Sequence, residues 1–125
     1  MDELCKNQGA QCHSIKLMND YCADLPLWPA DDAFLNDVMS RLTTRLQKSL
    51  RALAKRFNAH FSWDTGWDDS EREVRHCRHM NSAFRRLKDE LGPEWKVTMS
   101  LWECSEDVQR KVELDMEMSI SKRTD

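Results

Sequence analysis

The chain has little glycine and little proline, three of each among 125 residues. This scarcity excludes collagen-like and low-complexity sequences, in which these residues are abundant. No run of about 18 apolar residues occurs, so we expect no membrane-spanning helix. The N-terminal segment also lacks the basic and apolar regions of a secretory signal. We therefore expect one compact cytoplasmic domain over residues 1–125, with no membrane partner.

Catalytic motifs are missing as well. The glycines stand at positions 9, 66 and 92, too far apart for a phosphate-binding loop, and neither C-x-x-C nor H-E-x-x-H occurs. The five cysteines are odd in number and irregularly spaced, which argues against a disulfide framework and favours reduced thiols. We expect no enzymatic activity, no cofactor and no metal.

Two groups of residues keep a metal site open as an alternative. His76 and His79 are three residues apart, and a helix would bring their imidazoles near one another, with Cys104 or Glu73 as a further ligand. A second group near the N-terminus has gaps unlike those of paired zinc ligands and consists of Cys5, Cys12, His13 and Cys22. A thiol enzyme would need Cys104 to meet His60. Zinc- or thiol-dependent catalysis is therefore the most distant alternative function.

Apolar spacing predicts two long helices. The first begins at Asp31 or Asp32, has no glycine or proline over residues 30–65, and carries one apolar stripe at intervals of three, four and seven residues. The second begins with a capping box formed by Ser70 and Glu73 and ends before Gly92, which precedes a proline.

Alternating apolar and polar residues predict strands elsewhere. A short strand is expected at 60–63, and a hairpin at 96–104 and 111–120. Residues 1–30 are less clear, with a short helix followed by a linker in which two prolines hold the backbone extended. The predicted fold class is α+β, in the order α-α-β-α-β-β. Its two long helices pack on one face of a three-stranded, mostly antiparallel sheet.

The net charge of −3 conceals a strong segregation. Residues 41–63 hold six basic and no acidic side chains, and residues 74–88 hold five basic and none acidic. The rest of the chain is acidic. Both positive blocks coincide with the predicted long helices, opposite their apolar stripes. We predict a binding surface made of Arg41, Arg45, Lys48, Arg51, Lys55, Arg72, Arg75, Arg78, Arg85 and Arg86.

Tryptophan is the other unusual component, with five residues against one tyrosine. We add Trp67 and Trp102 to the predicted binding residues, because an exposed tryptophan is an effective interface anchor. Trp28, Trp63 and Trp95 are expected to pack against the core.

These features predict a small regulatory or inhibitory protein that acts by protein–protein interaction. Immunity proteins, antitoxins and inhibitors encoded by phages or plasmids combine small size with charged surfaces. The arginines favour a partner with an acidic surface, since the guanidinium donates two hydrogen bonds to a carboxylate. A nucleic-acid-binding module using the same helices is the alternative, because phosphates attract the same side chains. A homodimer, joining the basic surface to the acidic residues Glu113, Asp115 and Glu117, and a merely solvated basic surface also remain open.

Overall fold

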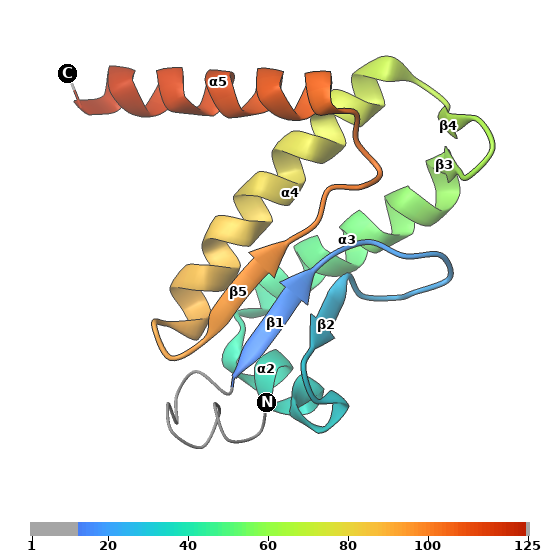
Figure 1. Ribbon diagram of the computed structural model, residues 1–125. Helices are drawn as coiled ribbons and strands as arrows, with labels where there is room; N and C mark the ends of the chain where they lie inside the picture. The colour runs from blue at the N-terminus through green and yellow to red at the C-terminus, as the bar shows by residue number, and fades with distance from the viewer. Residues whose placement is uncertain (1–12, 125) are drawn as a thin grey trace.

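The computed structural model describes residues 13–124, and the side chains of residues 13–118. It contains one small sheet, a short hairpin and a set of helices (Figure 1). The elements are β1 (Ser14–Leu17), β2 (Leu27–Pro29), the 3-10 helix η2 (Asp32–Phe34), α2 (Leu35–Arg41), α3 (Thr44–His60), β3 (Phe61–Ser62), β4 (Gly66–Trp67), α4 (Ser70–Leu91), β5 (Lys96–Met99) and α5 (Glu106–Thr124). The α+β class is confirmed, although the predicted order of elements is wrong at both ends.

The sheet has the strand order β2-β1-β5. β1 is antiparallel to β2 but parallel to β5, so the sheet is mixed rather than mostly antiparallel. The long helices α3 and α4 lie on the same side of it, as predicted (Figure 1). The main core lies between the two layers, where Ile15 and Leu17 of β1 meet Leu50 of α3 and Met80 and Leu87 of α4.

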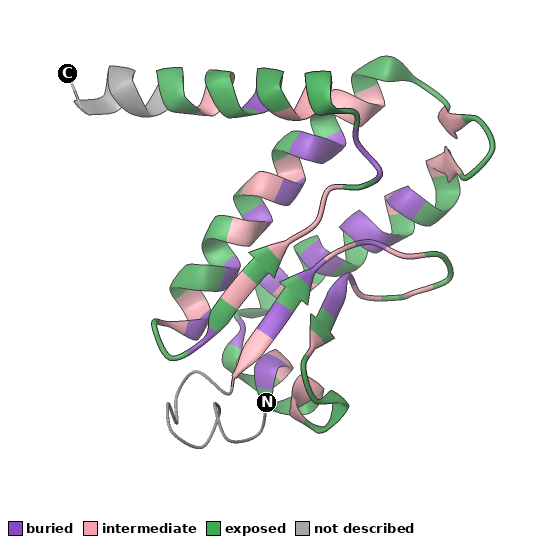
Figure 2. Cartoon of the chain, in the orientation of Figure 1, coloured by how far each residue is buried: buried purple, intermediate pink, exposed green. Residues whose placement is uncertain are grey.

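The other side of the sheet faces solvent. Lys16 is exposed between the buried residues of β1, and Trp28 and Thr98 lie opposite it on the neighbouring strands. Figure 2 shows buried segments on the inner sides of α3 and α4 and exposed segments on their outer sides. The apolar side of each of the two helices therefore faces the core, as the sequence predicts.

The first predicted long helix is interrupted. Leu42 is extended, with ψ 145°, and separates α2 from α3. Thr43 caps α3 by accepting a hydrogen bond from the Leu46 amide through Oγ1, while its own amide donates to Glu90 of α4 at 2.7 Å. The Gln47 side chain donates to carbonyls at the end of α2. These polar contacts stabilise a break that apolar spacing alone does not reveal, whereas Asp31 caps η2 as expected.

The predicted C-terminal hairpin is wrong, because its second strand is the helix α5. Val112 is buried, Val108 and Met116 are partly buried, and these three residues follow a spacing of four. Leu114 and Met118, which the alternation would place beside them, are 55% and 59% exposed. The first strand of the hairpin ends at Met99 instead of residue 104 and pairs with β1.

Among the described residues before Asp20, Ser14–Leu17 form a strand rather than the predicted helix. Ile15 and Leu17 are buried in β1 while Lys16 is exposed, which is the period of a strand. The expected extended segment near the prolines is present and includes β2. The expected strand at 60–63 is confirmed in part as β3, which pairs with β4.

The second long helix agrees closely with its prediction. Its cap is Asp69 rather than Ser70, since the Asp69 carboxylate accepts from the Glu71 amide. Glu73, expected to complete a capping box, instead accepts a hydrogen bond from the Ser105 amide. Gly92 ends the helix with φ 83°, a left-handed conformation that favours glycine.

Candidate functional site

A groove runs between α3 and α4 and has a volume of about 410 Å³. Its floor includes Leu53 and Ala83, which belong to the core-facing sides of the two helices. Its rim is basic and contains Arg45, Lys48, Arg56, His79 and Arg86. Part of each positive block predicted on the two helices therefore lies along one concave surface.

Most of this positive charge is uncompensated. Within the part of the chain whose side chains are described, Arg45 and Lys48 form no ion pair. Arg56 donates only to the carbonyl of Ala52 in its own helix, at 3.3 Å. Arg86 reaches Glu90 at 3.4 Å. The groove thus offers several guanidinium and ammonium donors to an external anion.

The pKa of His79 is affected by burial and by the positive charge of the groove. Its burial lowers the pKa below the ordinary value of 6.5, and the neighbouring cations, Arg56 foremost, lower it further. Protonation would add a positive charge beside arginines that already carry one, and these charges repel each other. His79 therefore stays neutral over a wider pH range than an exposed histidine.

We expect an NMR titration to place the pKa of His79 below 6.5, and Arg56→Gln to raise it by removing one of the repelling charges. Since the unfolded chain binds this proton more readily, the contribution of His79 to stability falls as pH decreases from 6.5 towards the lower folded pKa. Arg110→Gln on α5 serves as the control and should leave the titration unchanged. A pKa of 6.5 or above in the wild type would contradict the expectation.

The other predicted basic residues are distributed more widely. Arg72 and Arg75 line a small cavity that shares Arg56 and His79 with the groove and so extend it beside Trp67. Arg72 also pairs with Asp68 at 3.1 Å, and the hydrogen bond from His60 together with Arg72 lowers the pKa of that carboxyl group.

Five predicted residues lie outside the groove. Arg41 pairs with Asp37 on α2, and Arg78 contacts Asp115 of α5 at 3.5 Å. Arg51 and Lys55 line a different hollow, beside the loop that connects β1 and β2. Arg85 is exposed on α4 and lines neither surface. The structure therefore separates the predicted set into a groove group and a dispersed group.

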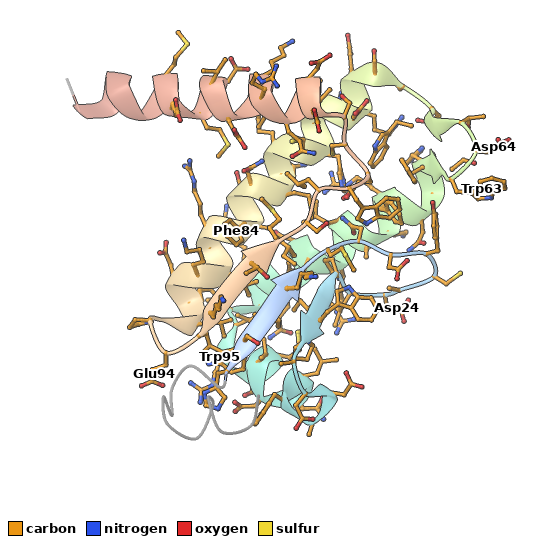
Figure 3. The ribbon with its side chains drawn as sticks, in the orientation of Figure 1. Asp24, Trp63, Asp64, Phe84, Glu94 and Trp95 are labelled. Carbon is orange, nitrogen blue, oxygen red and sulfur yellow. The ribbon has the colours of Figure 1, made fainter. Side chains whose placement is uncertain are left out.

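The binding role of Trp67 and Trp102 stays a prediction, and Trp102 has the exposure that this role requires, at 44%. Trp67 is half-buried and donates from Nε1 to the carbonyl of Glu103, and Trp102 donates to the carbonyl of Asn19, both at 2.8 Å. Both pack edge-on against Phe57. Trp95 is buried as predicted, but Trp28 is 40% exposed and Trp63, at the tip of the β3–β4 hairpin, is 81% exposed (Figure 3). The expectation that these two pack into the core is wrong.

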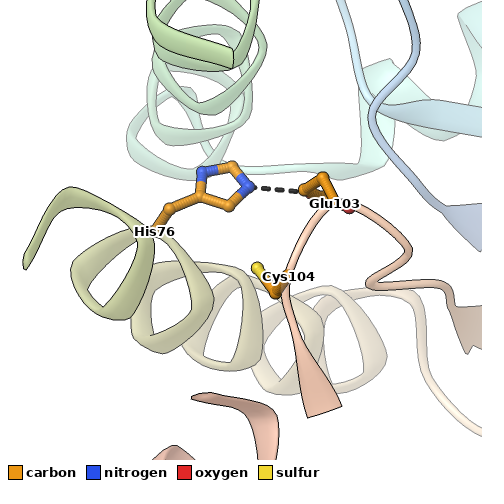
Figure 4. Close-up of side chains that lie close together, drawn as sticks. All are labelled: His76, Glu103 and Cys104. Carbon is orange, nitrogen blue, oxygen red and sulfur yellow. Dashed lines mark hydrogen bonds and ion pairs between the residues drawn. The ribbon is translucent and has the colours of Figure 1, made fainter. Parts of the chain in front are cut away.

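A buried polar cluster lies beneath the tryptophans, formed by Asn19, His76 and Glu103. Oε2 of Glu103 accepts from the amide of Asn19 and lies 2.8 Å from Nε2 of His76 (Figure 4). Neither Asn19 nor Glu103 was predicted from the sequence as a functional residue. The detectable signal is that His76 precedes Met80, Ala83 and Leu87 at helical spacing, on the buried side of α4.

The structure places only some residues of the predicted metal and thiol sites near one another. His76 lies beside Cys104, but His79 lines the groove instead. Cys5 and Cys12 fall outside the described residues. Cys104 is buried, and its hydrogen bond with Cys77 and its burial both raise the pKa of the thiol. His60 is hydrogen-bonded to Asp68 rather than to Cys104, so the thiolate–histidine pair that a thiol enzyme would need does not form.

No helix in residues 13–124 has both the length and the apolar character needed to cross a bilayer. Residues 13–101 match the model of a family described as "Serratia CdiI immunity protein-like". No curated protein matches the chain. The matched segment extends from β1 through β5 and contains both walls of the groove.

Proposed function

Because the chain belongs to the Serratia CdiI immunity protein-like family, we propose that it neutralises a protein toxin by binding it through the α3–α4 groove. The family supports an inhibitor that acts by protein binding, in agreement with the sequence prediction of an immunity-type protein. The finer proposal concerns the interface. It assigns recognition to Arg45, Lys48, Arg56 and Arg86, with Arg72 and Arg75 at one end of the same surface.

The observation that supports this interface is a concave, partly apolar floor surrounded by cations, of which Arg45, Lys48 and Arg56 form no ion pair within the described residues. A convex acidic segment of a toxin would complement it in both shape and charge. Arginine is suited to this task because its planar head donates two parallel hydrogen bonds to a carboxylate. The partner is therefore a toxin domain with an acidic surface.

The first experiment identifies the partner. Open reading frames beside this gene are expressed one at a time, and the product that arrests growth is tested with and without co-expression of the full chain. We expect restored growth and a stable complex of the two purified proteins. If no neighbouring product is toxic, the same co-expression screen is extended to the other open reading frames of the genome. Absence of any neutralised toxin after that screen would refute the function.

The second experiment tests the groove. Arg45, Lys48 and Arg56 are changed together to glutamate, and binding to the identified toxin is measured by calorimetry. Charged hydrogen bonds contribute about 1.5–3 kcal/mol each, so we expect affinity to fall by about 100-fold or more. Lys16, Lys96 and Arg110 are exposed outside the groove and form the matched control when changed to glutamate together. Equal affinities for both triple variants would refute the groove as the interface.

Salt dependence separates a toxin from nucleic acid. If the groove bound duplex DNA, log affinity would fall with log salt concentration at about −0.9 per phosphate contacted. We expect no such DNA binding by the wild type. DNA binding lost only in the groove variant, with toxin binding intact, would reassign the surface to nucleic acid.

A further inference from the structure

We propose that His76, Glu103 and Cys104 form a zinc-binding site. One ligand atom from each residue lies within 4.8 Å of the other two, and all three residues are buried. His76 comes from α4, while Glu103 and Cys104 are adjacent in the segment between β5 and α5 (Figure 4). Imidazole nitrogen, thiolate sulfur and carboxylate oxygen are the ligands that zinc takes in proteins.

Unpartnered polar atoms provide an independent argument for a ligand. Oε1 of Glu103, Nδ1 of His76 and Oδ1 of Asn19 are buried, and none has a hydrogen-bond partner among the residues that the structure describes. Buried polar atoms are nearly always satisfied, since leaving one without a partner costs about 1–3 kcal/mol. Three such atoms in one cluster therefore indicate a polar group that the described residues do not supply, and Oδ1 of Asn19 is the one among them that the ion would take.

Zinc fits the cluster with a small adjustment. Nε2 of His76 and Oε2 of Glu103 are 2.8 Å apart. Two ligands at about 2.0–2.1 Å from a tetrahedral ion would be roughly 3.3 Å apart, so this pair must open by about 0.5 Å. Zinc binds carboxylate, neutral imidazole and thiolate, so the imidazole of His76 keeps one proton, on Nδ1, while the thiol proton of Cys104 and any second proton held between Nε2 and Oε2 leave to solvent.

Asn19 offers the fourth ligand. Its Nδ2 lies 3.3 Å from Nε2 of His76 and 2.8 Å from Oε2 of Glu103. Turning the amide by half a turn places Oδ1, which no described residue contacts through a hydrogen bond, at this position. Four protein ligands make a closed structural site, which would join the end of β1, α4 and the segment before α5.

The test measures zinc in the full chain. Protein from zinc-supplemented cells is analysed by mass spectrometry of its metal content, then freed of metal and titrated with Co²⁺, whose thiolate complex absorbs strongly. We expect one equivalent of zinc and a Co²⁺–thiolate band, with a higher melting temperature when zinc is added. The N-terminal thiols are removed in a Cys5→Ser, Cys12→Ser variant, which should still bind one equivalent.

The chain supplies matched controls for two of the ligands. Cys77 is a buried free thiol beside Cys104, and His79 lies one helical turn from His76. Cys104→Ala and His76→Gln should lose the band and the thermal shift, whereas Cys77→Ala and His79→Gln should keep them. Loss in the controls but not in the ligand variants, or a wild type without zinc, would overturn the proposal.

A measurement on the wild type covers the case in which a ligand variant fails to fold. Thiol alkylation is followed by peptide mass spectrometry with and without zinc. We expect zinc to slow modification of Cys104 at least tenfold while leaving the exposed Cys22 unchanged. Equal rates for Cys104 in both conditions would refute the site.

Discussion

Phe57→Ala is expected to lower the free energy of unfolding by about 3–5 kcal/mol. Phe57 is fully buried at the centre of an aromatic cluster. Its ring centroid lies 5.1 Å from that of Phe61 and 5.6 Å from that of Trp102, and it also contacts Tyr21 and Trp67. Rings of this size cannot collapse fully into the space that alanine would leave, so the cavity penalty adds to the lost burial.

The effect extends to hydrogen bonds, because Phe57 holds the two tryptophans whose indole groups donate to the carbonyls of Glu103 and Asn19. Urea denaturation followed by circular dichroism gives the change in free energy. Trp63→Ala is the control, since this side chain is largely exposed on the neighbouring hairpin and its removal should change stability by less than about 0.5 kcal/mol. Similar losses in the two variants would contradict the central role of Phe57.

The helices that form the groove could be predicted because their signals are local and long. In α4 the apolar stripe repeats over several turns, and Gly92 marks its end. The helix α5 could not be predicted from its apolar pattern. Its apolar residues stand at every second position, which is the pattern of a strand, although the segment is helical. Ser105 provides the better signal, because its hydroxyl accepts from the Val108 amide at the start of the helix.

The candidate sites likewise combine features that local spacing predicts with features that only the tertiary packing determines. Cationic residues opposite an apolar stripe must be exposed, so the basic character of the groove follows from helical periodicity. That Arg45 and Arg86 lie on one rim depends on how α3 packs beside α4, which periodicity does not specify. The cluster of Asn19, His76 and Glu103 brings together residues up to 84 positions apart. Of this cluster, helical spacing could predict only that His76 lies on the buried side of α4.

Removing the carboxylate from that cluster is the second substitution with a large expected effect. In metal-free protein kept in a chelator, Glu103→Ala should lower the free energy of unfolding by about 3–5 kcal/mol. The reason is that the Asn19 amide and Nε2 of His76 lose the acceptor at 2.8 Å that they share, while both stay buried. Glu94→Ala is the control, because Glu94 is exposed in the turn before β5 and should change stability little.

A double-mutant cycle distinguishes this interaction from a simple loss of packing. If Glu103 stabilises the fold through His76, the substitutions Glu103→Ala and His76→Ala should together cost less than the sum of their separate effects by about 0.5–3 kcal/mol. Strict additivity would indicate that the two side chains act independently, and the 2.8 Å contact would then have no net energetic role. Because the cycle is measured without metal, its result is independent of the proposed zinc site and reports only on the buried polar contacts of the chain.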